Sequence, residues 1–502
     1  MIYSAADASG APAADTGKGE NMSNETGHTK LKRVLGFPAS YGAAVGLVVS
    51  GTAMFSVASV AGTAGFATFI SSGIALIPIM AAAFAFGELA SMIPGGGMIS
   101  DYTNPALGKF FATFSILSCY VMLIACDGGS QLVMGGMSLQ AMCGIPQLAV
   151  SLFLLVAALL INIFDVGMYG KVESIATVSM MLIFLVMAVS GTLGVGEGMG
   201  VAHVVNTGFI PEGGMSSVFS TVGAAIWFFI GFEFACPMAE ENKKPYKNIP
   251  YALILGLLSI YIVDNIFVWG AVKYTDLSIL TVSSTPQVDA AVATLGTVGG
   301  FTMSVLTILA SFTTTNAYIA ALPRMLYGMA RDKQIPAAFG KIHPKYRVPM
   351  VGTMATFGLI LVTTLYLTYE GGTADAINSF INAACITWVI TYMIAMVDVL
   401  VLRKRYPDFP RLWKAPAAKI TLPIGMIGAV YAISTLAYVL PVAIAVMAVV
   451  ALYTVIWNKS HGMPVNEIIP LENSVKMIRE RTEYCEGWDE AVEEWLRKRN
   501  AL

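Results

Sequence analysis

Charged residues are scarce in this chain. Of its 502 residues only 12% are Asp, Glu, Lys or Arg, while 56% are hydrophobic. A soluble domain carries about 25% charged residues, so the composition excludes an ordinary water-soluble fold and indicates a chain that lies mostly in a bilayer. The formal net charge of −2 leaves no basic face for nucleic acid, which we exclude as a partner.

The motifs of common enzyme and metal chemistry are also missing. The sequence contains no HExxH, GxSxG or Walker A motif, which argues against a membrane enzyme. Its six cysteines show no disulfide or zinc spacing, and its four histidines fall outside the long apolar runs. We therefore expect no enzymatic activity, no cofactor and no metal-ligating cluster of His and Cys.

Long apolar runs fill most of the sequence. A helix that crosses the hydrocarbon core needs about 20 mostly apolar residues. By this criterion the sequence predicts an all-α polytopic membrane protein with twelve transmembrane helices, at about 40–63, 66–93, 110–136, 147–165, 171–194, 218–238, 250–272, 296–322, 349–368, 378–402, 417–438 and 440–457.

Basic residues fall almost entirely in alternate connections between these spans. Of the 29 Lys and Arg residues, only Lys273 lies in a connection of the opposite set. Because positively charged loops stay in the cytoplasm, we expect a multi-pass protein of the cell (plasma or inner) membrane with both termini cytoplasmic. Residues 1–34, rich in small polar residues, are expected to be a disordered tail, and the amphipathic segment 459–502 to form cytoplasmic helices.

Two of the predicted spans contain interruptions. The first carries Ser50-Gly51-Thr52-Ala53 at its middle, and the sixth carries a glycine and a carboxylate within Phe229–Glu233. A broken helix is tolerated in lipid only where its backbone is buried in protein or lines a cavity, and transporters hold their substrates at such breaks. Their spacing predicts two inverted five-helix repeats, 35–195 and 196–402 with an outer loop at 195–217, followed by two extra helices in 403–458.

Few ionisable residues fall within the spans, where burial is expensive and usually functional. Asp127 lies deep in the third span, and Glu233 lies beside the break of the sixth, where it either braces the break or contacts substrate. Lys171, near the start of the fifth span, is either a membrane-edge anchor or a desolvated amine that exchanges protons. The half-helix N-termini would suit a carboxylate, and the unwound carbonyls an ammonium group.

Several segments resemble the amino acid–polyamine–organocation family. They are AFGELASMIP at 85–94 with three glycines after it, WFFIGFE at 227–233 with KPYKNIP at 244–250, and the segment 316–336 with the His-Pro pair at 343–344. The resemblance covers about 35–458. It implies the leucine-transporter-like fold, a 5+5 inverted repeat with discontinuous helices 1 and 6, and alternating access around a site between spans 1, 3, 6, 8 and 10.

The resemblance implies roles for residues at the two breaks. Gly51, Thr52 and Ala53 take the place of the family's Gly-Ser-Gly, whose backbone, after Ser50, holds the substrate carboxylate. The carbonyls of Phe229, Ile230 and Gly231 would hold the substrate amine.

Three further positions gain a role from the same resemblance. Trp227 matches an aromatic residue that closes over substrate in some members. Lys171 matches a lysine at a sodium-site position in proton-dependent members. Ser311, Thr314 and Thr315 lie where sodium-dependent relatives place ligands, so they are the alternative ion site.

The expected function is secondary active transport of amino acids, either proton-coupled or by exchange (antiport). Gly-Thr-Ala in place of Gly-Ser-Gly, and the extra carboxylate of Asp127, favour an amine-bearing substrate, so a carrier of an organic amine (a polyamine or an ethanolamine-like molecule) is the alternative. A transporter-derived sensor that relays through the C-terminal helices is a distant third. The expected partners are a small-molecule substrate, a proton and the lipid bilayer.

Overall fold

The described part of the chain is helical throughout. The computed structural model describes residues 32–164, 166–201 and 205–500; for 166–175 it describes the helix but not the side chains. The described residues contain no named strand, and one isolated bridge joins Leu35 to Asn242. The first ten α-helices are α1 (Phe37–Gly46), α2 (Gly51–Ala64), α3 (Thr68–Met92), α4 (Ile99–Ala106), α5 (Lys109–Ser115), α6 (Met122–Cys143), α7 (Gln147–Phe164), α8 (Val166–Thr192), α9 (Val195–Gly198) and α10 (Gly214–Ser220).

The second half of the chain continues in the same way. Its α-helices are α11 (Val222–Ile226), α12 (Pro245–Tyr274), α13 (Leu277–Val282), α14 (Pro286–Arg331), α15 (Met350–Tyr369), α16 (Ala374–Arg405), α17 (Ala418–Thr435), α18 (Leu440–Ser460), α19 (Leu471–Arg481) and α20 (Trp488–Asn500). Short 3-10 and π-helical turns complete the set: η1 (Gly65–Ala67), η2 (Ile116–Val121), η3 (Trp227–Phe229), η4 (Phe232–Glu240) and η5 (Ala337–Gly340).

Ten helical segments of the described residues are long and apolar enough to cross a membrane. One of them, Gly51–Met92, covers parts of the expected first and second spans, and Ala176–Thr192 is a shorter apolar helix at the expected fifth. The all-helical, multi-pass architecture is therefore confirmed. The number twelve, the two inverted repeats, the division into segments and the orientation stay predictions.

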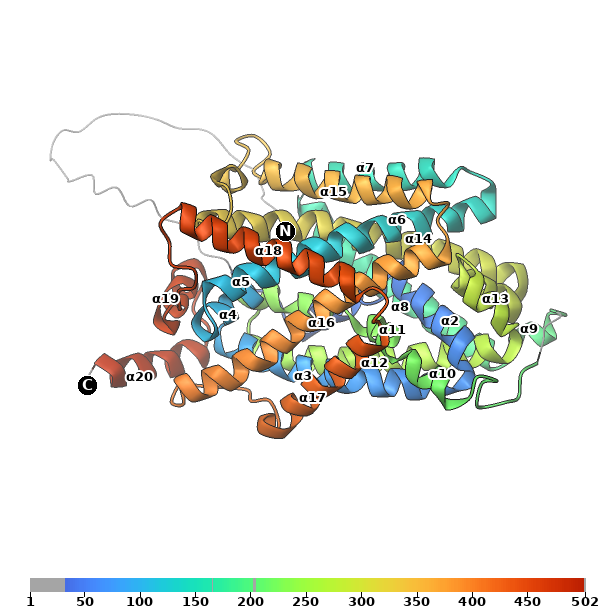
Figure 1. The fold of residues 1–502 in the computed structure, drawn as a ribbon, viewed down its shortest axis with the longest axis horizontal. Helices are drawn as coiled ribbons and strands as arrows, with labels where there is room; N and C mark the ends of the chain where they lie inside the picture. The colour runs from blue at the N-terminus through green and yellow to red at the C-terminus, as the bar shows by residue number, and fades with distance from the viewer. Residues whose placement is uncertain (1–31, 165, 202–204, 501–502) are drawn as a thin grey trace, which may run out of the picture.

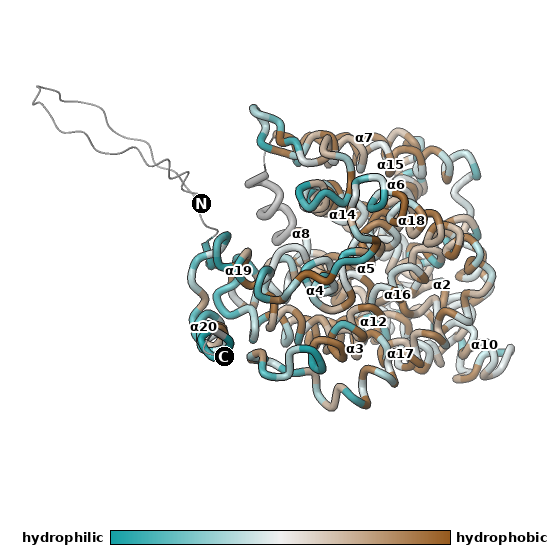
Figure 2. The backbone as a smooth tube through the Cα atoms, turned by 60° about the vertical axis from the view of Figure 1, so that its left-hand side comes forward, coloured by the Kyte–Doolittle hydropathy of each residue, from teal (hydrophilic) through white to brown (hydrophobic). Residues whose placement is uncertain are grey.

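Most of the helices run along the long axis of the molecule (Figure 1). At one end lie α4, α19 and α20, and at the other lie α9, α10 and α13. We call the first end the tail side and the second the opposite side. In Figure 2 the helices between the two ends are largely hydrophobic, whereas α19 and α20 carry much of the hydrophilic colour. This distribution is what a lipid-embedded bundle with a polar cap requires.

The interrupted sixth span lies at the centre of the bundle, and α18 lies at its edge. In the most apolar stretch of Val222–Glu240, 78% of the residues are buried, against 11% in α18. A central position is where an irregular backbone can find protein partners instead of lipid.

The first span is interrupted between α1 and α2. Ser50 is extended and caps α2, because its Oγ accepts a hydrogen bond from the Ala53 amide at 3.2 Å. The interruption therefore covers Leu47–Ser50, slightly before the expected position. Gly51, Thr52 and Ala53 form the first turn of α2 instead of the break.

The sixth span is interrupted between η3 and η4. Ile230 is extended, and Gly231 has φ 108°, a backbone conformation that side chains with a Cβ rarely adopt. A Cβ on Gly231 would lie 3.0 Å from Cδ2 of Leu47, which is the first residue after α1. The two breaks therefore lie directly against each other.

The Glu88 carboxylate of α3 holds the loop after α16 in place. Glu88 is fully buried and accepts hydrogen bonds from Arg403 Nε at 2.9 Å and Nη2 at 2.5 Å, from Arg411 Nε at 3.2 Å and from the Ala415 amide at 2.8 Å. This cluster explains why the AFGELASMIP segment carries a carboxylate in an otherwise apolar helix.

Substitution of Glu88 should destabilise the protein. Breaking a buried ion pair by removing one partner costs about 3–5 kcal/mol, because the other charge stays buried without compensation. We expect Glu88→Gln to lower the melting temperature of the detergent-purified protein by several degrees. Glu494→Gln, which removes an exposed carboxylate paired with Lys498, is the matched control and should leave it unchanged. Equal melting temperatures for the two variants would contradict a structural role for the cluster.

Candidate functional site

Thr52 lies at the centre of a buried hydrogen-bond network beside the two breaks. Its Oγ1 donates to Asp127 Oδ1 of α6 at 2.7 Å. The same oxygen accepts from Gln131 Nε2 at 2.8 Å and from Trp227 Nε1 at 3.2 Å. One hydroxyl therefore joins α2, α6 and the interrupted sixth span.

Asp127 is a buried carboxylate surrounded by neutral donors. Its Oδ2 accepts from the Tyr318 hydroxyl at 2.7 Å and from Gln131 Nε2 at 3.1 Å, and only 1% of the residue is exposed. Among the side chains that the structure describes, no Lys, Arg or His forms an ion pair with it. Hydrogen bonds orient this carboxylate, but no described cation matches its charge.

The start of α2 packs closely against α6 and α14. A Cβ on Gly51 would lie 2.6 Å from Ser311 Oγ and 3.0 Å from Gln131 Oε1. The Thr52 amide donates to that same Gln131 oxygen at 3.3 Å. Gly51 is therefore a position where a side chain would separate three helices.

Glu233 belongs to a second buried network, on the far side of the sixth-span break. Its Oε1 accepts from Trp388 Nε1 at 2.6 Å and from the Tyr120 hydroxyl at 3.4 Å, and its Oε2 accepts from the Tyr392 hydroxyl at 2.6 Å. These bonds join η4 to α16 and to the π-helical turn η2, a kind of turn that is frequent at functional sites. The edge-to-face rings of Trp227 and Trp388, 6.4 Å apart, connect the two networks.

The hydroxyls of Ser311, Thr314 and Thr315 are buried on α14. None of their oxygen atoms has a hydrogen-bond partner among the described residues. Hydroxyl oxygens of this kind suit a hard cation or water. Lys171, the other ion-coupling candidate, is in α8, and its side chain lies outside the residues that the structure describes.

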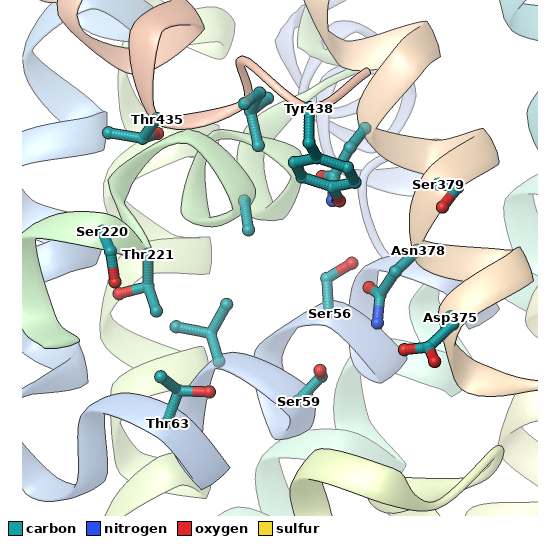
Figure 3. Close-up of a pocket in the computed structure, with 14 residues that line it drawn as sticks. Ser56, Ser59, Thr63, Ser220, Thr221, Asp375, Asn378, Ser379, Thr435 and Tyr438 are labelled. Atoms are coloured by element: carbon teal, nitrogen blue, oxygen red, sulfur yellow. The ribbon is translucent and has the colours of Figure 1, made fainter. Parts of the chain in front are cut away.

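A polar cavity of about 370 Å³ lies beside α2 and the start of the sixth span (Figure 3). Ser56, one turn beyond Thr52 on α2, lines it, together with Ser220 and Thr221 at the start of the sixth span and Asp375 and Asn378 of α16. In Figure 3 these polar groups surround the same space. The cavity is therefore lined by polar residues of α2, of the start of the sixth span and of α16, the first two of which are parts of the interrupted spans.

The structure brings most of the expected site residues together. Thr52, Asp127 and Trp227 share one network, and Ser50, Gly51 and Ala53 form the capped start of α2 beside it. Ile230 and Gly231 form the facing break directly after Phe229, the last residue of η3, whereas Glu233 lies in the second network.

Two residues of the network were not predicted from the sequence. Gln131 follows Asp127 by four residues and so lies on the same face of α6, and Tyr318 follows Ser311 by seven on α14. These helical spacings from already chosen positions are the signal that could have identified both.

An all-helical bundle with two facing helix breaks and a buried polar site between them is characteristic of membrane transport proteins. Comparison with known families agrees: the family model described as "Amino acid permease" matches residues 35–459. The chain belongs to this family of multi-pass membrane permeases.

Three Bacillus subtilis proteins are among its similar relatives. The branched-chain amino acid permease BcaP is 25% identical over 442 residues, which covers 82% of this chain and 90% of the relative. The glutamate/serine transporter AimA is 26% identical, covering 76% of this chain and 74% of its own. A methylthioribose transporter is also 26% identical, covering 74% and 81%.

Removal of the Trp227 indole N–H should impair transport more than folding. Trp227→Phe keeps a ring that packs at the break but deletes the donor to Thr52, a bond worth about 1 kcal/mol. We expect the transport rate to fall at least about fivefold, while the yield of folded protein in size-exclusion chromatography falls less than twofold. Trp457→Phe, which deletes an exposed indole bond to the Lys333 carbonyl, is the control. Parallel losses of rate and yield would make Trp227 a packing residue.

Proposed function

We propose that the chain is a secondary active transporter that moves amino acids across the cell membrane by alternating access. The observation that carries the proposal is the direct contact of the two helix breaks at Leu47 and Gly231, next to the Thr52–Asp127 network. Family membership and the printed names of two relatives, a branched-chain amino acid permease and a glutamate/serine transporter, support the substrate class.

The breaks supply complementary groups for an amino acid. The first turn of α2 presents amide N–H groups and the positive end of a helix dipole, which suit a carboxylate. At the facing break, the extended Ile230 takes its backbone out of helical geometry, which suits the coordination of an ammonium group by carbonyls. Trp227 lies between the two, where it can close over a substrate.

An amine without a carboxylate is the second candidate substrate. The Thr52 and Ala53 amides already donate to Gln131 Oε1 and Ser50 Oγ, so a substrate carboxylate has to displace both acceptors. Asp127 needs no such displacement to attract an ammonium group, because its charge is not matched by a described cation. The name of the methylthioribose transporter also indicates that relatives of this chain carry more than amino acids.

Competition between amino acids and their decarboxylated amines should separate the two candidates. In proteoliposomes, an amino acid site predicts that the amine competes at least about tenfold less well than its parent, since it lacks the bonds of the carboxylate. Equal competition would assign the site to amines. A complete lack of flux for both classes would instead favour a transporter-derived sensor.

The role of Asp127 can be measured in the same assay. If Asp127 pairs the substrate ammonium, Asp127→Asn should weaken the apparent affinity by about 10- to 100-fold, the value of one hydrogen bond to a charged group. Asp276→Asn removes an exposed carboxylate that caps α13 and keeps the cap, so it should leave affinity unchanged. An unchanged affinity in Asp127→Asn would limit Asp127 to holding α2 against α6.

We propose that the coupling ion is a proton carried by Lys171. Its position in a predicted span and its match to the family's lysine support this role, and Ser311, Thr314 and Thr315 are the sodium alternative.

Lys171→Ala should abolish accumulation driven by a pH gradient. Exchange of substrate for substrate, which needs no net proton movement, should persist within about threefold of the wild-type rate. The control is Lys341→Ala, an exposed lysine in the loop after α14. Sodium-driven accumulation that survives Lys171→Ala would overturn proton coupling and assign the α14 hydroxyls to the ion.

A further inference from the structure

The chain after α18 runs back across the tail side of the bundle and binds segments from both halves of the sequence. Its Glu467 carbonyl accepts from the Lys109 amide at 2.8 Å, and the Ile469 amide donates to the Asn104 carbonyl at 3.2 Å. The Leu471 amide donates to the Tyr406 hydroxyl, in the loop after α16, at 3.3 Å. We call residues 466–500 the C-terminal clamp.

The two helices of the clamp are joined to each other and to the end of α3. Arg479 of α19 pairs with Asp489 of α20 at 2.8 Å, and Asp489 also accepts the Cys485 amide at 2.6 Å. Trp488, 1% exposed, donates from Nε1 to the Met92 carbonyl at 3.0 Å. That bond satisfies an end carbonyl of α3, where helices leave such groups unpaired.

Arg33, just before α1, connects the clamp to the interrupted sixth span. Its Nη1 donates to the Ala239 carbonyl in the last turn of η4 at 2.7 Å and to the Asn242 carbonyl just after η4 at 3.0 Å. On its other side it donates to the Glu483 carbonyl at 3.0 Å and the Thr482 hydroxyl at 3.2 Å. Arg33 is 9% exposed, so one buried guanidinium holds three chain segments.

The entry to α1 and the end of η4 are also bound to each other directly. The Leu35 amide donates to the Glu241 carbonyl, and the Lys243 amide donates to the Leu35 carbonyl, both at 2.9 Å. Asn242 donates from Nδ2 to the Ser40 hydroxyl in α1 at 2.6 Å. The tail-side halves of the two broken helices are therefore joined by backbone and side-chain bonds, with the clamp covering the junction.

We propose that the C-terminal clamp is a conformational lock that holds the tail side of the transporter closed. The lock rests on the proposed alternating access, in which the passage on this side opens as α1 and the end of η4 part. Arg33 cannot keep its four acceptors when these segments separate, because they belong to different parts of the chain. Release of the clamp therefore lowers the barrier to opening, and a bound clamp slows transport.

Hydrogen exchange of the full-length protein in lipid nanodiscs tests the lock without any substrate. Trp488→Ala removes the contact with the end of α3, and Thr482→Val removes one acceptor of Arg33. In both variants, peptides from α1 and η4 should exchange faster than in the wild type, by about tenfold in Trp488→Ala, because local opening becomes more frequent. Peptides from α15, which has no bond to the clamp among those described above, should be unchanged.

Transport supplies the second readout and Lys498→Ala the matched control. Lys498 is a cation of α20 that pairs only with Glu494 of the same helix among the ion pairs of the described residues, so its variant should behave as the wild type. Both lock variants should raise the substrate exchange rate at least about twofold.

The proposal would be overturned if, in the two variants, hydrogen exchange of α1 and η4 stayed at the wild-type rate and only α19 and α20 exchanged hydrogen faster. The clamp would then only cover the surface. Hydrogen exchange that became faster in all helices, α15 included, would also overturn the proposal. So would a transport rate that does not rise. An absence of amino acid transport in every protein would contradict the proposed function, and the exchange of α1 and η4 would still decide whether the lock exists.

Discussion

Every backbone N–H and C=O group inside a membrane must find a partner within the protein, and this constraint governs the whole structure. It allows only helices through most of the bundle, and the interruptions of the first and sixth spans lie where they meet each other. Leu47 and Gly231 bring the two breaks into contact, and Ser50, Gln131 and Trp227 supply the polar side chains that such a site needs. The buried polar site between the breaks is thus a consequence of how the breaks are made compatible with lipid.

Three buried carboxylates show how the surroundings of one chemical group set its role. Glu88 pairs with the guanidinium groups of Arg403 and Arg411, and this pairing fixes the loop after α16 against α3. Glu233 faces two hydroxyls and an indole, which brace η4 against α16 and η2. Asp127, like Glu233, is oriented by neutral donors and has no described cation beside it, but it bonds to Thr52 at the start of α2, next to the two breaks where we propose that substrate binds.

The family resemblance proposed from short motifs is confirmed by a family model that covers 35–459. The sequence also singled out Thr52, Asp127 and Trp227, and the structure shows that Thr52 bonds to both of the others. Their shared role in binding substrate stays a prediction. The break in the first span was placed a few residues late, because small residues mark the region of an interruption whereas the cap of Ser50 decides where the helix restarts. Gln131 and Tyr318 were not predicted, because neither residue stands out in the sequence until its hydrogen bond to the Asp127 carboxylate is seen.

The sequence by itself determined that this is a multi-pass helical membrane protein, because the apolar length and low charge that a membrane span needs are properties of each segment alone. Its short motifs also indicated the permease family. Tertiary structure alone decided which polar residues meet. Arg33 and Thr482 are separated by 449 residues, and Thr52 and Trp227 by 175, so no local pattern records their contact. The same reason explains the clamp: its composition predicted amphipathic helices, but only the packed chain shows that they contact Arg33 and the end of α3.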